Sequence, residues 1–304
     1  MELFKQDSRI DFMGARWWTA AISVLFFVGS LLSLSVYGLK WGLDFTGGTQ
    51  IEVVYEQAAD LAGIRSELAK VGFNEAVVQS YGTSKDVLIS IAPRADLDQT
   101  HLIQKMMNAL PGAKKMREEY IGAQVGQEMA TKGALAVILA MFATMIYIAM
   151  RFEYRFAVSA AAALIHDPLL ILGIFSFYQI DFDLKALAAL LAVIGYSLND
   201  TIVVFDRVRE NFVKHRKLTP LETMNLSINQ TLSRTIMTSV LTLVVVVSLF
   251  VYGGETIHGF ALALIIGIVV GTYSSIYVAG TMAIVLGLNR KDLLPRARLI
   301  DERP

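Results

Sequence analysis

Six apolar runs, each long enough to cross a lipid bilayer as a helix, constrain this 304-residue chain more than any other feature. The sequence is 55% hydrophobic and only 18% charged, and that charged fraction is well below the one typical of soluble domains. We therefore predict a membrane α-helical bundle of six transmembrane helices. The spans are expected at 18–38, 133–150, 156–178, 185–205, 235–252 and 260–287.

The first run has a competing interpretation, a cleaved signal peptide. It follows Trp17 and Trp18, an aromatic pair suited to a membrane interface, and it stays apolar for about 20 residues. No convincing small-x-small cleavage site comes after it. These features favour an uncleaved anchor.

Residues 40–132, between the first and second runs, have shorter apolar stretches and read as a folded domain. Residues 49–55 are β-branched and partly alternating, which predicts a strand, and apolar residues recur at helical spacing from Leu61 to Val71. Further strands are expected at 77–81, 87–91 and 115–121, and a second helix at 97–110. The order β-α-β-β-α-β predicts a small α+β domain of the ferredoxin-like type.

The chain is thus expected to have four parts. They are the N-terminal segment with the first span (1–39), the α+β domain (40–132), the bundle of the other five spans (133–288) with a loop at 206–234, and a tail (289–304). In the loop, Thr219 and Glu222 have the spacing of a capping box with Pro220 between them. This pattern predicts a short helix to Leu232 that lies on the membrane or against the bundle.

Lysine and arginine are unevenly distributed over the segments outside the spans. The basic residues on one side are Lys5, Arg9, Arg16, Arg151, Arg155, Arg207, Arg209, Lys214, Arg216, Lys217, Arg234, Arg290, Lys291, Arg296, Arg298 and Arg303. The connections at 179–184 and 253–259, on the other side, have none. The positive-inside rule therefore predicts that both termini face the cytoplasm and that the α+β domain faces the opposite side.

A carboxylate inside an apolar run is the strongest candidate for function. Asp200 lies roughly 9 Å inside Asp206, the residue at which this run leaves the membrane, at the helical rise per residue. A charged side chain at such a depth costs about 2.5 kcal/mol or more unless it is protonated, paired or hydrated. We therefore interpret Asp200 as a proton-binding residue; the structural alternative is a hydrogen bond to a neighbouring helix.

Arg234 is the candidate cationic partner of Asp200. It stands at the start of the fifth run, at or just inside the predicted cytoplasmic interface. One interpretation is a positive-inside anchor that reaches to water. The other is a cation that faces Asp200 across a helix pair and keeps the carboxylate ionised until the contact is lost. The second interpretation would make the pair a proton switch, and the sequence leaves both open.

Polar residues in two spans are secondary candidates. His166 and Asp167 lie near the middle of the third run, before Pro168, and they could relay protons or stabilise a helix kink and a helix contact. Ser197 and Asn199 precede Asp200; a structural hydrogen bond between helices is the favoured interpretation, and a hydrated path is the other.

The sixth run carries small residues at intervals of four, namely Ala263, Gly267, Gly271, Ser275 and Ala279. Such a stripe lets another helix approach closely. It predicts helix packing and points to no ligand.

Several function classes lack their characteristic residues in this sequence. There is no cysteine, which excludes disulfides, iron–sulfur clusters and thiolate zinc sites, and a formal net charge of zero gives no argument for nucleic acid. No Walker loop, H-E-x-x-H or G-x-S-x-G motif is present. We predict no enzyme activity, cofactor or metal, so that any work must draw on an ion gradient or on a partner's ATPase.

Four segments together resemble a known family. W-G-L-D-F-T-G-G-T at 41–49, Y-I-G-A-Q-V-G at 120–126, H-D at 166–167 and I-G-Y-S-L-N-D-T-I-V-V-F-D-R-V-R-E-N at 194–211 are similar, in the same order, to bacterial SecF. SecF is in the SecD/SecF family of the RND transporter superfamily. The resemblance implies six transmembrane helices in an RND-like half, with a periplasmic ferredoxin-like domain between the first two. Pro168 departs from the apolar residue expected at that position in the family.

The resemblance also implies a role in protein export. A family member is expected in the bacterial inner membrane, with SecD, YajC, the SecYEG translocon, a translocating preprotein and membrane lipid as partners. It would use the proton-motive force to draw the preprotein outward after SecA-driven entry. Asp200 and Arg234 match the family's membrane aspartate and arginine, whereas its other essential aspartate belongs to SecD. A complete proton path is therefore not expected in this chain alone.

Two other functions share these sequence features. An RND-type half-transporter for a small molecule or lipid has the same fold and buried acid, but a single small α+β domain without an apparent apolar pocket argues against it. A proton-independent scaffold of the translocon predicts that Asp200 and Arg234 matter no more than lipid-facing residues.

Overall fold

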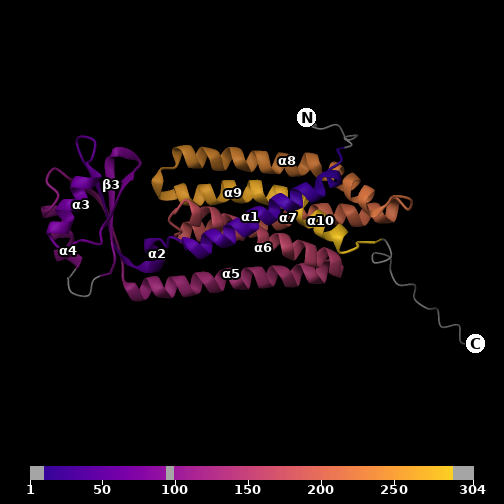
Figure 1. The fold of residues 1–304 in the computed structure, drawn as a ribbon, viewed down its shortest axis with the longest axis horizontal. Coiled ribbons are helices and arrows are strands. Elements are labelled where there is room, and N and C mark those ends of the chain that lie inside the picture. Colours follow the sequence, from indigo (N-terminus) through magenta and orange to yellow (C-terminus); the bar gives the residue numbers. More distant parts are fainter. Residues whose placement is uncertain (1–9, 94–98, 290–304) are drawn as a thin grey trace, which may run out of the picture.

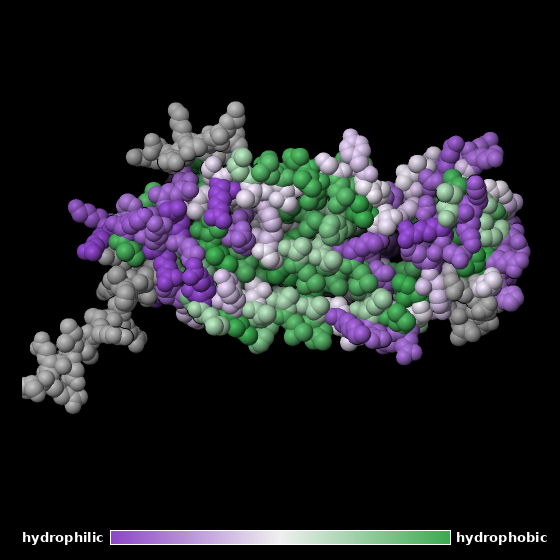
Figure 2. All heavy atoms as spheres, turned by 180° about the vertical axis from the view of Figure 1, so that it is seen from behind, coloured by the Kyte–Doolittle hydropathy of each residue, from purple (hydrophilic) through white to green (hydrophobic). Residues whose placement is uncertain are grey.

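Six helices in the described part of the chain are long and apolar enough to cross a membrane, as predicted. The computed structural model describes residues 10–93 and 99–289. The helices are α1 (Arg16–Val36, after the short η1, Met13–Ala15), α5 (Ala123–Arg151), α6 (Tyr154–Phe177), α7 (Leu184–Lys214) and α8 (Pro220–Tyr252), followed by a sixth that comprises η2 (Glu255–Ile257), α9 (His258–Ile276) and α10 (Val278–Val285). They form an elongated bundle with the α+β domain at one end (Figure 1). Apolar surface forms a band over the middle of the bundle, with hydrophilic surface at both ends (Figure 2).

The α+β domain has the predicted ferredoxin-like order of elements. Its strands are β1 (Gly48–Val54), β2 (Val77–Tyr81), β3 (Thr83–Ile91) and β4 (Lys114–Ile121), and its helices are α3 (Leu61–Lys70) and α4 (Gln99–Asn108). The strands make one four-stranded antiparallel sheet in the order β2-β3-β1-β4. Inward residues such as Ile51 and Ile89 of the sheet, Leu68 of α3 and Met106 of α4 are fully buried in its core. This alternation leaves the polar residues of the strands on the other face.

Three helices extend further than the apolar runs predict. α5 begins at Ala123, directly after β4 and Gly122, so that ten residues assigned to the domain are helical. α7 continues to Lys214 and α8 begins at Pro220, so that most of the loop expected at 206–234 is helical.

The short helix predicted after Thr219 is therefore the first part of α8, although its capping box and its proline at the first turn are present as expected. The helices are longer than predicted because hydropathy indicates only the length embedded in the membrane, whereas helix packing continues beyond the membrane. Outside the apolar runs, Val208 and Phe212 of α7 and Met224 and Ile228 of α8 are all buried in one cluster.

The α+β domain meets the bundle at a polar cleft with an aromatic contact beside it. The short helix α2 (Leu43–Thr46) carries Phe45, which stacks on Phe182 at 6.1 Å between ring centroids. Lys40 pairs with Asp181 at 2.7 Å. The cleft is lined by Gln50, Glu52, Gln79 and Arg117 of the sheet and by Asp181, Asp183, Lys185 and Thr256 of the bundle end.

The middle of the small-residue stripe of the sixth span, at Gly267 and Gly271, lies against α7. Ala263, Gly267, Gly271, Ser275 and Ala279 are all buried. A Cβ added at Gly271 would lie 2.9 Å from Ser197 Cβ, and one at Gly267 would collide with the Val193 side chain. The two helices therefore pack with their backbones close together, and this brings polar residues of α7 and α9 into contact.

Candidate functional site

Asp200 of α7 is buried in the bundle, with 4% of the residue exposed. Its Oδ2 atom has no hydrogen-bond partner. Leaving a carboxylate oxygen buried and unpaired is costly when the group is charged, because neither water nor a donor compensates for the lost hydration. The structural alternative, in which Asp200 simply bonds a neighbouring helix, does not account for this free oxygen.

Arg234 of α8 lies within electrostatic range of Asp200. Its side chain is exposed on the outside of the bundle, and no ion pair within 4.0 Å joins the two residues in the described part of the chain. Arg234 therefore lies near the Asp200 carboxylate without forming an ion pair with it. A contact between them would require a change of rotamer or a shift between α7 and α8.

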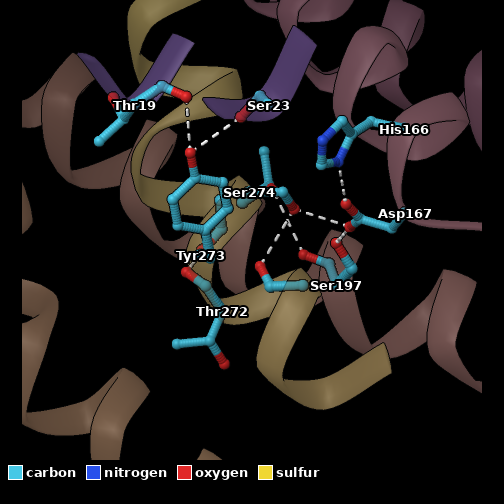
Figure 3. Close-up of polar contacts among 11 residues, drawn as sticks. Thr19, Ser23, His166, Asp167, Ser197, Thr272, Tyr273 and Ser274 are labelled. Atoms are coloured by element: carbon cyan, nitrogen blue, oxygen red, sulfur yellow. Dashed lines mark hydrogen bonds and ion pairs between the residues drawn. The ribbon is translucent and has the colours of Figure 1, made fainter. Parts of the chain in front are cut away.

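A second carboxylate, Asp167 of α6, forms the centre of a buried polar cluster (Figure 3). It is 1% exposed. Its Oδ1 atom pairs with His166 Nδ1 at 2.9 Å, and its Oδ2 atom accepts hydrogen bonds from Ser274 Oγ of α9 at 2.7 Å and from Ser197 Oγ of α7. The cluster thus joins three helices through one side chain.

The side chain of His166 extends from α6 to α1. Its ring stacks on Phe27 of α1 with 6.3 Å between ring centroids, and the residue is 4% exposed. The Nε2 atom is buried without a hydrogen-bond partner. On the same side of the bundle, Tyr273 of α9 donates a hydrogen bond to Thr19 O and contacts Ser23 Oγ, which ties α9 to α1 (Figure 3).

The predicted polar residues of α7 separate onto different faces. Ser197 is buried and bonds Asp167, whereas Asn199 is exposed and its side chain makes no hydrogen bond within the described residues. Sequence reasoning missed Ser274. The signal available was its position next to Ser275 in the small-residue stripe, on the face that α7 approaches.

No group of three or more His, Cys, Asp or Glu residues in the described part of the chain could hold a metal ion. The candidate features of the bundle are two buried carboxylates, a buried histidine and an exposed arginine. Such an arrangement can bind and release protons and can change its net charge inside the membrane. The fold and the site together define a multi-pass membrane protein with ionisable groups in its helix bundle.

Comparison with known proteins identifies the family. Residues 101–289 match the family described as "Protein export membrane protein SecD/SecF, C-terminal", and residues 32–59 match the "SecD/SecF GG Motif". The chain belongs to the SecD/SecF family of protein export membrane proteins.

Similar proteins cover nearly the whole chain. "Protein translocase subunit SecF" of Vibrio alginolyticus is 47% identical over 97% of this chain and 95% of its own length. The proteins of the same name from Pseudomonas aeruginosa and Escherichia coli O157:H7 are 45% and 41% identical, over 97% and 93% of this chain and 98% and 90% of their own lengths.

A crystal structure of SecDF, described as a translocon-associated membrane protein from Thermus thermophilus, has the same fold. It superposes with a TM-score of 0.85 at 34% identity over 93% of this chain. The match covers 39% of the SecDF chain, so that this chain corresponds to less than half of that protein.

Proposed function

We propose that this chain is a subunit of the Sec protein-export machinery that works with a SecD subunit and uses the proton-motive force. Asp200 binds and releases protons, and Arg234 favours its charged form when the two approach. The helix bundle passes the change of charge on to the α+β domain. The proposal rests on Asp200, which is buried and has an unpaired carboxylate oxygen. Uptake of a proton removes the charge and with it the free-energy cost of burying that charge in the membrane.

The surface of α7 supports the need for a partner subunit. Ala188, Ala192, Gly195 and Asn199 are exposed and recur at helical spacing on one face. Small residues and an amide suit close packing against another transmembrane helix better than contact with lipid. The similarity to less than half of a SecDF chain is consistent with a separate SecD-type partner.

The proposed orientation rests on charge. Arg151 and Arg209, at the end of the bundle away from the α+β domain, pair with Asp206 and Glu153, and further basic residues follow α7. Under the positive-inside rule this end faces the cytoplasm and the α+β domain faces the periplasm of a bacterium with an inner membrane. There the domain would meet a preprotein that leaves SecYEG, with YajC as a further neighbour.

The test is proton-driven export in inverted membrane vesicles that contain the whole chain, SecD and SecYEG. We expect Asp200→Asn to abolish the stimulation of export by the proton gradient and to leave SecA- and ATP-driven entry intact. Asp206→Asn, the same change on the same helix at the surface, is the matched control and should keep the stimulation. Equal stimulation in the Asp200→Asn vesicles would favour the proton-independent scaffold instead.

A further inference from the structure

The His166–Asp167 pair has no part in the proposed action of Asp200, yet it is the most completely buried ionisable cluster described above. Asp167 receives three hydrogen bonds on its two oxygens, from His166, Ser197 and Ser274. An ionised carboxylate is a pure acceptor, and this set of donors matches it. The pair therefore holds a negative charge whenever the imidazole is neutral.

The same hydrogen bonds determine which nitrogen of His166 carries the hydrogen. Because Nδ1 faces the Asp167 carboxylate at 2.9 Å, Nδ1 is the donor. In a neutral imidazole the other nitrogen then has a free lone pair. That nitrogen is Nε2, which is buried and has no partner. A basic atom is thus available inside the bundle next to an uncompensated negative charge.

We propose that His166 is a second protonation site of the bundle, that Asp167 is its positioning residue, and that the site is electrostatically coupled to Asp200. A proton from water adds to Nε2: an N–H bond forms, the donor O–H bond breaks, and hydroxide or neutral water leaves. The net charge of the pair changes from −1 to zero. In a low-dielectric interior the neutral pair is easier to accommodate than an isolated carboxylate.

The groups around the pair identify Asp200 as the ionisable residue that is affected by the change in the pair's net charge. Ser197 bonds Asp167, and Asp200 follows it by three residues on the same face of α7. From α9 the neighbouring ionisable group is Tyr273, whose hydroxyl is bonded to Thr19 O. No ionisable side chain is present in α10, or in α1 after Arg16. In α5 the ionisable residues are Tyr147 in the apolar part and Glu128, Lys132 and Arg151 nearer the ends. Protonation of His166 therefore removes a negative charge on the side of α7 that carries Asp200.

The inference goes beyond the proposed function and is tested without any export assay. The chain has four histidines, of which His101, His215 and His258 lie outside the cluster. Replacing these three with glutamine leaves His166 as the single histidine and leaves its contacts intact. The full-length protein, labelled with ¹⁵N-histidine and reconstituted in lipid vesicles, is then titrated by solid-state NMR from about pH 8 to about pH 5.

We expect the Nε2 signal to change from an unprotonated to a protonated nitrogen over this range, while Nδ1 stays protonated. Adding Asp200→Asn should move the midpoint to lower pH, because the negative charge that Asp200 carries when it is deprotonated is gone, and adding Asp167→Asn should abolish the transition in this range. The conservative Asp167→Glu should restore part of it. A histidine that keeps one protonation state throughout, or a midpoint that Asp200→Asn leaves unchanged, would overturn the proposal; neither result would bear on the role of Asp200 in export.

Discussion

Gly271 of α9 lies so close to Ser197 of α7 that a Cβ on the glycine would be 2.9 Å from the serine Cβ. This approach places Ser197 and Ser274 around the same carboxylate, Asp167. Close helix packing and the buried polar cluster are therefore one arrangement: the small-residue stripe positions the donors that make a charge at Asp167 tolerable.

Gly271→Val should separate α7 from α9. We expect a loss of about 1–3 kcal/mol in the free energy of unfolding, because the added methyl groups collide with Ser197. Thermal unfolding of the purified protein in detergent measures this. Gly29→Val in α1 is the control, because nothing lies within 4 Å of a Cβ at that position. Equal melting temperatures for the two variants would contradict the packing argument.

Ser274→Ala removes one of the two hydroxyl donors to Asp167 Oδ2. A hydrogen bond to a charged group contributes about 1.5–3 kcal/mol, and we expect a destabilisation in that range. In Ser248→Ala the lost hydroxyl bonded only Val244 O of its own helix and was exposed, so that a change within about 0.5 kcal/mol is expected. The two variants are compared by denaturant or thermal unfolding, and equal effects at Ser274 and Ser248 would contradict the stabilising role of the Ser274–Asp167 hydrogen bond.

Replacing Arg234 should have little effect on stability but a large effect on function. Because Arg234 is exposed and makes no ion pair in the described part of the chain, Arg234→Gln should change the free energy of unfolding by no more than about 0.5 kcal/mol. It should nevertheless remove proton-dependent export in vesicles with SecD. Arg216→Gln, in the exposed turn between α7 and α8, loses the same charge and should keep export. A strong melting defect in Arg234→Gln would indicate an anchor rather than a switch.

Asp183 caps the first turn of α7 at the end of the bundle that faces the α+β domain. It accepts a hydrogen bond from Ala186 N at 2.8 Å, and burial raises its pKa above the ordinary value of 3.8. A carboxyl group with a raised pKa in the folded state binds protons more tightly when folded. Its contribution to stability is therefore present below pH 3.8 and is lost as the pH rises through the folded-state pKa.

Asp183→Asn keeps the cap without the partly buried charge and should melt at the same or a higher temperature than the parent protein at neutral pH. Asp183→Ala should cost about 1 kcal/mol through the lost cap. Melting curves at acid and neutral pH distinguish the two effects. The idea fails if Asp183→Asn is as destabilising as Asp183→Ala at neutral pH.

The spans and the element order of the α+β domain could be predicted from sequence because both depend on local periodicity. The ends of α5, α7 and α8 could not, because residues such as Phe212 and Met224 continue the helix by packing on neighbours outside the lipid. Ser197 and Asn199 show a similar limit. They are two residues apart, so they lie on nearly opposite sides of a helix, and only the neighbouring helices decide which side is buried.

The burial of Asp200 was expected from its position in an apolar run, whereas the sequence left open whether Arg234 reaches to water or faces Asp200. An arginine at the edge of a span has a long flexible stem, so its rotamer depends on what covers that side of the bundle. Ser274 could not be assigned from sequence because its partner, Asp167, is 107 residues away in the chain.

Infrared difference spectroscopy of the full chain with SecD in lipid tests most directly whether Asp200 carries a proton. A protonated carboxyl group has a C=O stretch well separated from that of a carboxylate. We predict a protonated-carboxyl band that disappears as the pH is raised, that is missing in Asp200→Asn, and that is retained in Asp206→Asn. A spectrum in which Asp200→Asn removes no such band at any pH would contradict the central claim.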